Sequence, residues 1–420
     1  MADLLVFLEG KLAGEISAAP ANSVEFRYDD TYLRNPRNTP LSLSAPLGRG
    51  TYEMRQWLDG LLPDNIAVRR RWAARRGASS ARPLDLLSTS VGLDCAGAVQ
   101  FSRPGAEGVL HARASGLEPQ SERQIADWIR AARQDWSAWE GLGSRGQFSL
   151  AGAQAKCAVH WDGSQWSAPY GDTPTTHILK PGVANFTDAE VVEHVCLVAA
   201  RDLGLDAAVS ELRHFESERV IVVTRFDRLR VGEATRRWHQ EDVCQAFGLD
   251  PERKYQVLGG PAPQEVGSLL RQESSDRHTD VERFRDALIY NWAIAAPDAH
   301  AKNYSLLLDG PDVCLAPLYD VISFLPYAHH GLLDLRIAMA FGDDHSVRAM
   351  GTPDAWRTAG KMLGLDPDAT ADRAADLLRR TPAAISDAID GLSAEDRSSR
   401  TLLPLLHSAQ ALADRVALSR

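Results

Sequence analysis

Apolar residues alternate with polar ones, or form short continuous runs, through the first half of the chain, and this pattern predicts β-strands. Residues 4–8 and 12–16 are apolar runs on either side of Glu9-Gly10-Lys11, an arrangement that predicts a β-hairpin. A third strand is predicted at residues 24–28, where apolar and polar positions alternate. Further strands are predicted at residues 158–161, 177–180 and 220–223, and helices at residues 52–62, 64–76, 125–139 and 188–203.

After Phe226 the pattern is predominantly helical, with helices predicted at residues 282–295, 353–363, 371–379 and 402–418. The apolar runs 304–308 and 313–316 predict one hairpin within this part. Residues 103–121 are dense in proline, glycine and serine, which indicates a linker. We therefore predict an α+β fold in three parts. These are a small N-terminal α/β domain at residues 1–103, a strand-containing lobe with the linker at residues 104–228, and a helical lobe at residues 229–420.

The composition is typical of a globular protein, because 44% of the 420 residues are hydrophobic and 24% are charged. Lysine and arginine number 46 against 56 aspartates and glutamates, and the resulting net charge of −10 excludes a global positive field that would attract nucleic acid. The five cysteines are scattered without a CxxC pair, which argues against a disulfide framework and a zinc site. The sequence shows neither a signal peptide nor an apolar run long enough to span a membrane. We expect a cytoplasmic protein with no membrane partner.

The spacing of Asp298, Asn303 and Asp320 predicts chemistry on a phosphoryl group. In such a site one carboxylate accepts the proton of the attacking hydroxyl, while an amide oxygen and a second carboxylate hold Mg²⁺ on the phosphates. The predicted hairpin at residues 304–316 separates the two metal ligands. The alternative is a helix end that carries solvated Asp, Lys and Asn side chains.

Two further features precede this constellation. Lys180 ends an apolar strand and could hold ATP phosphates, although a strand-end lysine in solvent is the alternative. Thr187 to Glu190 fits the S/T-x-x-E capping box, so we expect Glu190 at the start of the next helix and Glu193 available to pair with Lys180. A solvent-facing Glu193 is the alternative. Residues 146–156 are rich in small side chains, which let backbone N–H groups approach phosphate oxygens, but they match neither a Walker A nor a GxGxxG pattern.

Taken together, these motifs resemble the HipA family, whose members are serine/threonine protein kinases that act as toxins of bacterial toxin–antitoxin pairs. The matching core motifs are FSLAGAQAK (148–156), THILKP (176–181), RFDR (225–228), HQED (239–242), DAHAKN (298–303) and YDVIS (319–323). The N-terminal part resembles the family's N-terminal domain at PLSLS (40–44), LLPDN (61–65) and GLDCAGA (92–98). The resemblance covers nearly the whole chain in the right order. It implies a two-lobed, protein-kinase-like fold with an additional small N-terminal domain and a helical C-lobe.

The resemblance implies a role for each matching residue. Asp298 matches the catalytic base, and Asn303 and Asp320 match the Mg²⁺ ligands. Lys180 matches the lysine on the ATP phosphates and Glu193 the acidic residue that pairs with it. Ser149 matches a serine whose autophosphorylation ejects the neighbouring loop and switches the kinase off. The residues implied to contact ATP are the phosphate loop (Ala151, Gly152, Ala153, Gln154, Ala155 and Lys156), Lys180, the hinge residues Thr224 and Phe226, and His300, Asn303, Tyr319 and Asp320.

The family's activity is ATP- and Mg²⁺-dependent phosphorylation of a translation component, typically an aminoacyl-tRNA synthetase. The implied partner is a small helix-turn-helix antitoxin, HipB-like, that inhibits the toxin and carries it to operator DNA. One departure is visible, because many members have Gly-Asn where this chain has Ala295-Ala296, followed by Pro297. That departure supports an alternative, a catalytically weak co-repressor scaffold that acts with its antitoxin on operator DNA. A small-molecule kinase of the aminoglycoside-phosphotransferase kind is a further alternative, against which the Ser149-containing loop and the N-terminal domain argue.

Overall fold

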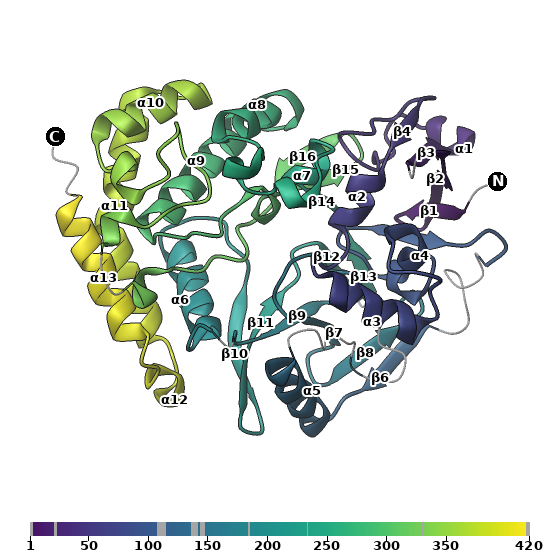
Figure 1. The fold of residues 1–420 in the computed structure, drawn as a ribbon, viewed down its shortest axis with the longest axis horizontal. Coiled ribbons are helices and arrows are strands. Elements are labelled where there is room, and N and C mark those ends of the chain that lie inside the picture. The colour runs from purple at the N-terminus through teal and green to yellow at the C-terminus, as the bar shows by residue number, and fades with distance from the viewer. Residues whose placement is uncertain are drawn as a thin grey trace. The chain divides into compact units, whose positions relative to one another are not determined.

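Figure 1 shows the computed structural model, which describes residues 3–20, 23–106, 115–135, 142, 148–183, 185–232, 234–328 and 331–416. The chain divides into two units. Unit 1 comprises Met1–Pro181, Arg213–Pro251 and Leu306–Val313, and unit 2 comprises Gly182–Leu212, Glu252–Ser305 and Cys314–Arg420. Each unit is described by itself below.

Unit 1 begins with an antiparallel sheet whose strand order is β4-β3-β2-β1-β5. The predicted hairpin is confirmed, with Leu4 opposite Ile16 in adjacent strands. The helix predicted at residues 52–62 begins later, because residues 51–53 pair with β3 as a short strand. The elements are β1 (Leu4–Leu8), β2 (Lys11–Ala18), β3 (Val24–Tyr28), α1 (Asp30–Leu33), β4 (Thr51–Glu53), α2 (Arg55–Gly60), α3 (Ile66–Arg76), α4 (Pro83–Leu87) and β5 (Val99–Ser102).

A second sheet follows with the strand order β10-β11-β9-β7-β8-β6. Strand β9, which carries Lys180, has a neighbour on each side, and Lys180 lies opposite Ile221 of β11. The predicted linker contributes β6, whereas residues 107–114 within it and residues 136–139 of the predicted helix 125–139 lie outside the described residues. The elements are β6 (Gly116–Pro119), α5 (Glu122–Gln134), β7 (Cys157–Trp161), β8 (Trp166–Tyr170), β9 (His177–Pro181), β10 (Ser210–Phe215) and β11 (Glu218–Thr224).

The segment directly after Phe226 is extended, so the expectation of a helical pattern from that residue onward is wrong for residues 228–242. Strands β12 (Arg228–Val231) and β13 (Ala234–Arg237) pair around a turn at Gly232, and β14 (His239–Asp242) joins a three-stranded sheet with β15 (Ser305–Asp309) and β16 (Asp312–Leu315). Arginines fill this ladder, which hides the alternation of apolar and polar positions on which strand prediction depends. The short helix α7 (Val243–Ala246) follows, capped by Asp242.

Unit 2 is mainly helical, and its long helix α11 contacts α6, α9, α10 and α13 (Figure 1). Its core includes Trp292 and Trp356, whose rings meet edge to face at 5.3 Å. The capping box predicted at Thr187 is wrong, because the N-cap of α6 is Asp188, in a left-handed conformation and without a side-chain hydrogen bond to the helix. The helices are α6 (Ala189–Asp202), α8 (Pro263–Glu273), α9 (Arg277–Ala293), α10 (Pro353–Leu363), α11 (Pro367–Asp390), α12 (Ala394–Arg397) and α13 (Leu402–Arg415).

Helix α11 is much longer than the helix predicted at residues 371–379, because it begins at an Asp366 cap and continues through an internal Pro382. A proline inside a helix removes one backbone hydrogen bond, so the sequence pattern understated the length of α11. Residues 417 and 418 of the predicted last helix lie outside the described residues. No helix in the described part of the chain is long and apolar enough to cross a membrane.

Candidate active site

The turn that carries Asp298 follows directly on the end of α9 in unit 2. Asp298 and Asn303 are joined within it, because the Asn303 side-chain Nδ2 donates a hydrogen bond of 2.6 Å to the Asp298 backbone carbonyl. The His300 backbone N–H donates to the same carbonyl at 2.8 Å. The Asn303 amide is thereby oriented, and its Oδ1 is the atom that could bind a cation. Asp298 and Asn303 therefore belong to one hydrogen-bonded turn.

The Asp298 carboxylate is 54% exposed and has two ordered neighbours. The Tyr255 hydroxyl donates a hydrogen bond to Asp298 Oδ1, and His300 Nε2 lies 3.7 Å from the same oxygen. The Tyr255 ring stands edge-on against the His300 ring at a centroid distance of 4.9 Å. Burial lowers the pKa of His300 to about 4, against the opposing effect of Asp298, so its ring is neutral at pH 7. Asp298 is accessible to an incoming hydroxyl and held by two uncharged groups.

No sequence motif pointed to Tyr255. Its place beside Asp298 comes from tertiary packing, since the two residues are 43 positions apart and no motif includes Tyr255. A backbone hydrogen bond of 3.1 Å, from the Ala301 N–H to the Lys254 carbonyl, also joins the turn that carries Asp298 to the residue before Tyr255. The Lys254 ammonium group lies 5.7 Å from the centroid of the Tyr255 ring.

Asp320 is brought to the same turn by its neighbour Tyr319. The Tyr319 hydroxyl donates to the Lys302 carbonyl at 2.6 Å and lies 2.6 Å from Ser305 Oγ. Lys302 and Ser305, which flank Asn303, therefore both contact Tyr319, the residue before Asp320. Asp320 itself has a positive φ of 53°, a conformation that is uncommon outside glycine and often marks functional sites.

The donor set fits magnesium rather than a metal caged wholly by protein. The described residues contain no group of three or more His, Cys, Asp or Glu side chains that could hold a metal ion. Mg²⁺ is usually bound by one or two carboxylates together with waters and substrate phosphates. One amide oxygen on Asn303 and one carboxylate on Asp320 match that requirement.

The phosphate loop lies in unit 1, and residues 146 and 147 of the small-residue stretch lie outside the described residues. Gly152 has φ of 111°, a backbone conformation that residues with a Cβ rarely adopt, so the position favours glycine. Lys156 Nζ donates to the Ala151 carbonyl at 2.8 Å, and Gln154 Nε2 donates to the Pro181 carbonyl at 3.0 Å. The loop is thus braced against the residue that follows Lys180.

Ser149 is fully buried. Its Oγ donates a hydrogen bond of 2.7 Å to the Leu61 carbonyl, and its backbone N–H donates to the Asp94 carbonyl at 2.8 Å. Both partners belong to the N-terminal part of unit 1. A kinase would need this segment to leave its site before the Ser149 hydroxyl could accept a phosphoryl group.

The candidate residues therefore form one set in each unit. Unit 1 holds the phosphate loop, Ser149, the buried Lys180 of β9, and Thr224 and Phe226 at the end of β11 and just after it. Unit 2 holds Asp298, His300, Asn303, Tyr319, Asp320 and Glu193, which is buried on α6. The pairing of Lys180 with Glu193 joins residues of different units and stays a prediction.

Known proteins resemble this chain along its whole length. The family model described as the HipA-like C-terminal domain matches residues 148–386, and that described as the HipA N-terminal domain matches residues 4–102. Y4mE of Sinorhizobium fredii, a protein designated a kinase, is 32% identical over 398 residues, which cover 93% of this chain and 92% of Y4mE. The serine/threonine-protein kinase toxin HipA of Shewanella oneidensis is 27% identical over 400 residues, covering 90% of this chain and 87% of the toxin.

A solved structure resembles the fold. It is the complex of HipA, HipB and operator DNA from Shewanella oneidensis, with a TM-score of 0.81 and 23% sequence identity. The match covers 99% of this chain and 100% of that chain. It confirms the predicted α+β, kinase-like fold.

Proposed function

The chain belongs to the HipA family, and from that premise we propose that it is a serine/threonine protein kinase that transfers the γ-phosphate of ATP to a protein hydroxyl. The observation that carries the proposal is the turn at residues 298–303. There an accessible carboxylate and an oriented amide are locked together by the hydrogen bond from Asn303 to the Asp298 carbonyl. A phosphoryl-transfer site requires a base and a metal ligand held in this way.

In the proposed reaction Asp298 orients the substrate hydroxyl and accepts its proton as the oxygen attacks the γ-phosphorus. The new P–O bond forms while the bond to the β-phosphate oxygen breaks, and ADP leaves. Tyr255 and the neutral His300 hold the Asp298 carboxylate, so it does not have to reorganise during the step. Asn303 and Asp320 would hold Mg²⁺, which neutralises charge on the phosphates when it is bound with ATP.

The remaining assignments follow from the family resemblance and from the position of each residue. Lys180 and the phosphate loop would bind the phosphates, with Glu193 positioning Lys180, and Thr224 and Phe226 would contact adenine. His300 and Tyr319 would line the ATP site beside Asn303 and Asp320. We also propose that Ser149 is autophosphorylated, which would stop the loop from returning to its buried position. A phosphate group adds about −1.5 to −2 charges at pH 7, which the fully buried position of Ser149 could not accommodate.

The proposed protein substrate is a translation component such as an aminoacyl-tRNA synthetase, and the proposed partner is a small helix-turn-helix antitoxin. Support for the partner comes from the solved Shewanella oneidensis assembly, which contains HipA, HipB and operator DNA. A net charge of −10 favours contact with operator DNA mainly through the antitoxin. We place the protein in the cytoplasm, where such a substrate and ATP are available.

Incubation with labelled ATP, Mg²⁺ and a cell lysate, followed by mass spectrometry of phosphosites, tests the proposal. We expect phosphate on serine or threonine hydroxyls, and a rate at least about 100-fold lower in Asp298→Asn, because the amide cannot accept the proton. The variant should still bind ATP, since its side chain keeps its size. A variant that retains more than about a tenth of the wild-type rate would remove Asp298 from the role of base. A wild-type protein that turns over no ATP but occupies operator DNA with an antitoxin would favour the co-repressor scaffold instead.

A further inference from the structure

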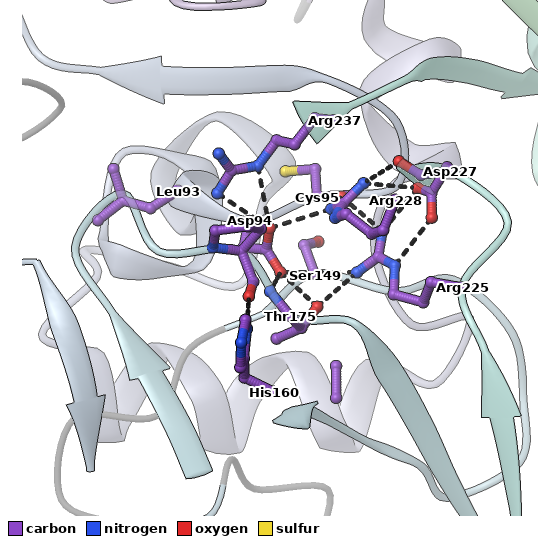
Figure 2. Close-up of polar contacts among 12 residues, drawn as sticks. Leu93, Asp94, Cys95, Ser149, His160, Thr175, Arg225, Asp227, Arg228 and Arg237 are labelled. Carbon is purple, nitrogen blue, oxygen red and sulfur yellow. Dashed lines mark hydrogen bonds and ion pairs between the residues drawn. The ribbon is translucent and has the colours of Figure 1, made fainter. Parts of the chain in front are cut away.

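Two motifs that the sequence analysis noted contain charged residues with no role in the proposed reaction. They are GLDCAGA (residues 92–98) and RFDR (residues 225–228), which lie more than a hundred residues apart. The structure brings them together in a network that we call the ion cluster (Figure 2). It consists of Asp94, Arg225, Asp227, Arg228 and Arg237 with the hydroxyl of Thr175, all within unit 1. The side chains of Asp94, Arg225 and Arg228 are at most 1% exposed.

Each acidic side chain of the ion cluster has several cationic donors. The Asp94 carboxylate accepts hydrogen bonds from Arg228 Nη2 at 3.0 Å and from Arg237 Nε at 3.2 Å. The Asp227 carboxylate accepts from Arg225 Nη2 at 2.7 Å and from Arg228 Nη1 at 2.9 Å. Arg228 thus bridges the two carboxylates. Thr175 adds a second link, because its hydroxyl donates to Asp94 at 2.6 Å and accepts from Arg225 Nη1 at 2.7 Å. Figure 2 shows these side chains converging from separate segments of the chain.

The two carboxylates of the ion cluster are charged at neutral pH although they are buried. Burial opposes ionisation of Asp227, but Arg225 and Arg228 outweigh it and lower the pKa of that carboxyl to about 2. Arg228, Arg237 and Arg225 likewise lower the pKa of Asp94 against the effect of burial. Buried ion pairs seldom make a protein more stable than apolar residues of the same volume would. The ion cluster is therefore better explained by a need to hold neighbouring segments in fixed positions than by stability alone.

Backbone hydrogen bonds around the ion cluster show which segments of the chain it holds. The Asp94 carbonyl accepts the hydrogen bond from Ser149 N–H, at the approach to the phosphate loop. Arg225 N–H donates to the Thr176 carbonyl at 2.9 Å, directly before β9 and its Lys180. Arg225 also stands between the proposed hinge residues Thr224 and Phe226. Three segments that would contact ATP thus begin at residues held by one network.

We propose that the ion cluster positions the phosphate loop, β9 and the hinge segment for nucleotide binding, so that its hydrogen bonds set ATP affinity and not only stability. The inference rests on the proposed function, since it takes ATP as the ligand. Its residues act through the segments that they hold and would not touch the nucleotide themselves. They are positioning residues.

Thr175→Val in the full-length protein tests the proposal, because it keeps the side-chain shape and removes the hydroxyl that bonds to both Asp94 and Arg225. The direct ion pair of 3.5 Å between Arg225 Nη1 and Asp94 stays in place. We expect about a threefold to tenfold higher dissociation constant for ATP, the range in which coupled residues usually act. We also expect faster hydrogen exchange in peptides that contain the Ser149 amide, measured without ATP. Thr175→Ser restores the hydroxyl and should match the wild type in both measurements.

Asp172→Asn is a second control. Asp172 is 45% exposed and accepts a hydrogen bond from Arg237, but it lies outside the Asp94–Ser149 contact. This variant should change neither ATP affinity nor Ser149 exchange. Asp172→Asn thus shows the effect of weakening a contact at the edge of the ion cluster. That effect can be compared with the effect of removing the Thr175 hydroxyl inside the cluster.

A lower melting temperature in Thr175→Val with unchanged ATP affinity and unchanged exchange would overturn the proposal. If Thr175→Val does not fold, Arg237→Gln at the rim of the cluster takes its place with the same expected outcomes. Wild-type protein that fails to bind ATP would instead refute the proposed function. The exchange measurement would still decide whether the ion cluster holds the Ser149 segment, because faster exchange supports that role and unchanged exchange excludes it.

Discussion

Tyr255 shows how a single side chain can complete a site that a sequence motif only begins. Its hydroxyl donates to the Asp298 oxygen that His300 also approaches, and its ring packs edge-on against the His300 ring. Tyr255 therefore binds Oδ1 directly, and His300 Nε2 lies 3.7 Å from the same oxygen. The ring packing fixes Tyr255 in place, which favours a role in orienting the carboxylate.

Tyr255→Phe should lower kcat by about tenfold, because a hydrogen bond to a charged group contributes roughly 1.5–3 kcal/mol. The KM for ATP should stay unchanged, since no ATP contact is removed. Tyr327→Phe is the matched control, because its hydroxyl donates to the Thr187 carbonyl instead. Steady-state kinetics of both variants would check the assignment, and a kcat higher than that of the wild type would mean that Tyr255 blocks the base rather than orienting it.

Ala295 gives the departure at residues 295–297 a structural meaning. Its φ is 47°, in the left-handed region that glycine adopts readily and alanine does not. An alanine therefore adopts a strained conformation at this position. The Ala296 N–H bonds to the Asn291 carbonyl at 2.8 Å, so the turn forms despite the strain.

Ala295→Gly should raise the free energy of unfolding by about 1 kcal/mol through the relief of that strain. Ala296→Gly is the control, because its φ is not positive and glycine there only adds freedom to the unfolded chain. It should lower the free energy of unfolding. Denaturant titrations of both variants measure the effect, and equal destabilisation by the two changes would contradict the strain at Ala295.

At the scale of elements, the segment around Ser149 is docked on the N-terminal part of unit 1. Phe148 meets the Trp72 ring edge to face at 5.7 Å, and the Ser149 hydroxyl bonds to Leu61. The Gly152 carbonyl accepts from Asp64 N–H at 3.0 Å. The N-terminal part of unit 1 therefore provides the surface that holds residues 148–152 in place.

Prolonged incubation of the wild type with ATP and Mg²⁺ should place phosphate on Ser149 while its activity falls. Ser149→Ala should keep its activity over the same time, because no phosphate can prevent the loop from redocking. Ser88→Ala is the control, as its hydroxyl also donates to a backbone carbonyl, that of Asp85. It should lose activity as the wild type does. Phosphopeptide mapping with a parallel activity assay checks this, and loss of activity by Ser149→Ala at the wild-type rate would refute the switch.

At the scale of the whole molecule, buried histidines make stability depend on pH. His239 is fully buried, with Nε2 2.9 Å from the Leu41 carbonyl and Nδ1 accepting from Ala98 N–H at 3.3 Å. Burial lowers its pKa from 6.5 to about 4, against the opposing effects of the Leu41 bond and Asp227. Between those pH values the unfolded chain binds a proton that the folded chain does not, so stability falls as the pH drops from about 6.5 to 4.

His239→Gln should be less stable than the wild type at pH 7, yet lose less stability on acidification. From pH 7 to pH 5 the difference in this loss should be about 2 kcal/mol, the linkage expected for one such histidine. Glu241, whose pKa is raised to about 7 by burial, acts in the opposite direction in both proteins and cancels from the comparison. Denaturant unfolding at the two pH values measures the difference, and parallel losses would contradict the assignment to His239.

The strands and helices with clear periodicity were predictable because their pattern is local. The hairpin of β1 and β2, the buried strand β11 and helix α10 all appear where apolar spacing predicts them. Elements without a clear apolar periodicity were predicted poorly. The arginine-rich strands β12 and β13 were not predicted, and the predicted length of the proline-containing helix α11 was too short. The N-cap of α6 was also mispredicted. A capping motif shows only that a side chain could cap the helix, whereas the backbone conformation of the folded chain makes Asp188 the N-cap.

The sequence by itself determined the family and the order of the candidate residues, because these depend on residue types at short spacings, as in Asp298 to Asn303. Only the tertiary structure decided which distant residues meet. Tyr255 reaches Asp298, Ser149 binds Leu61, and Asp94 joins Arg228, through contacts that span 43 to 134 positions. No local pattern records such partners. A buried hydrogen bond or ion pair forms only when packing has excluded water from both groups, and that is a property of the folded chain.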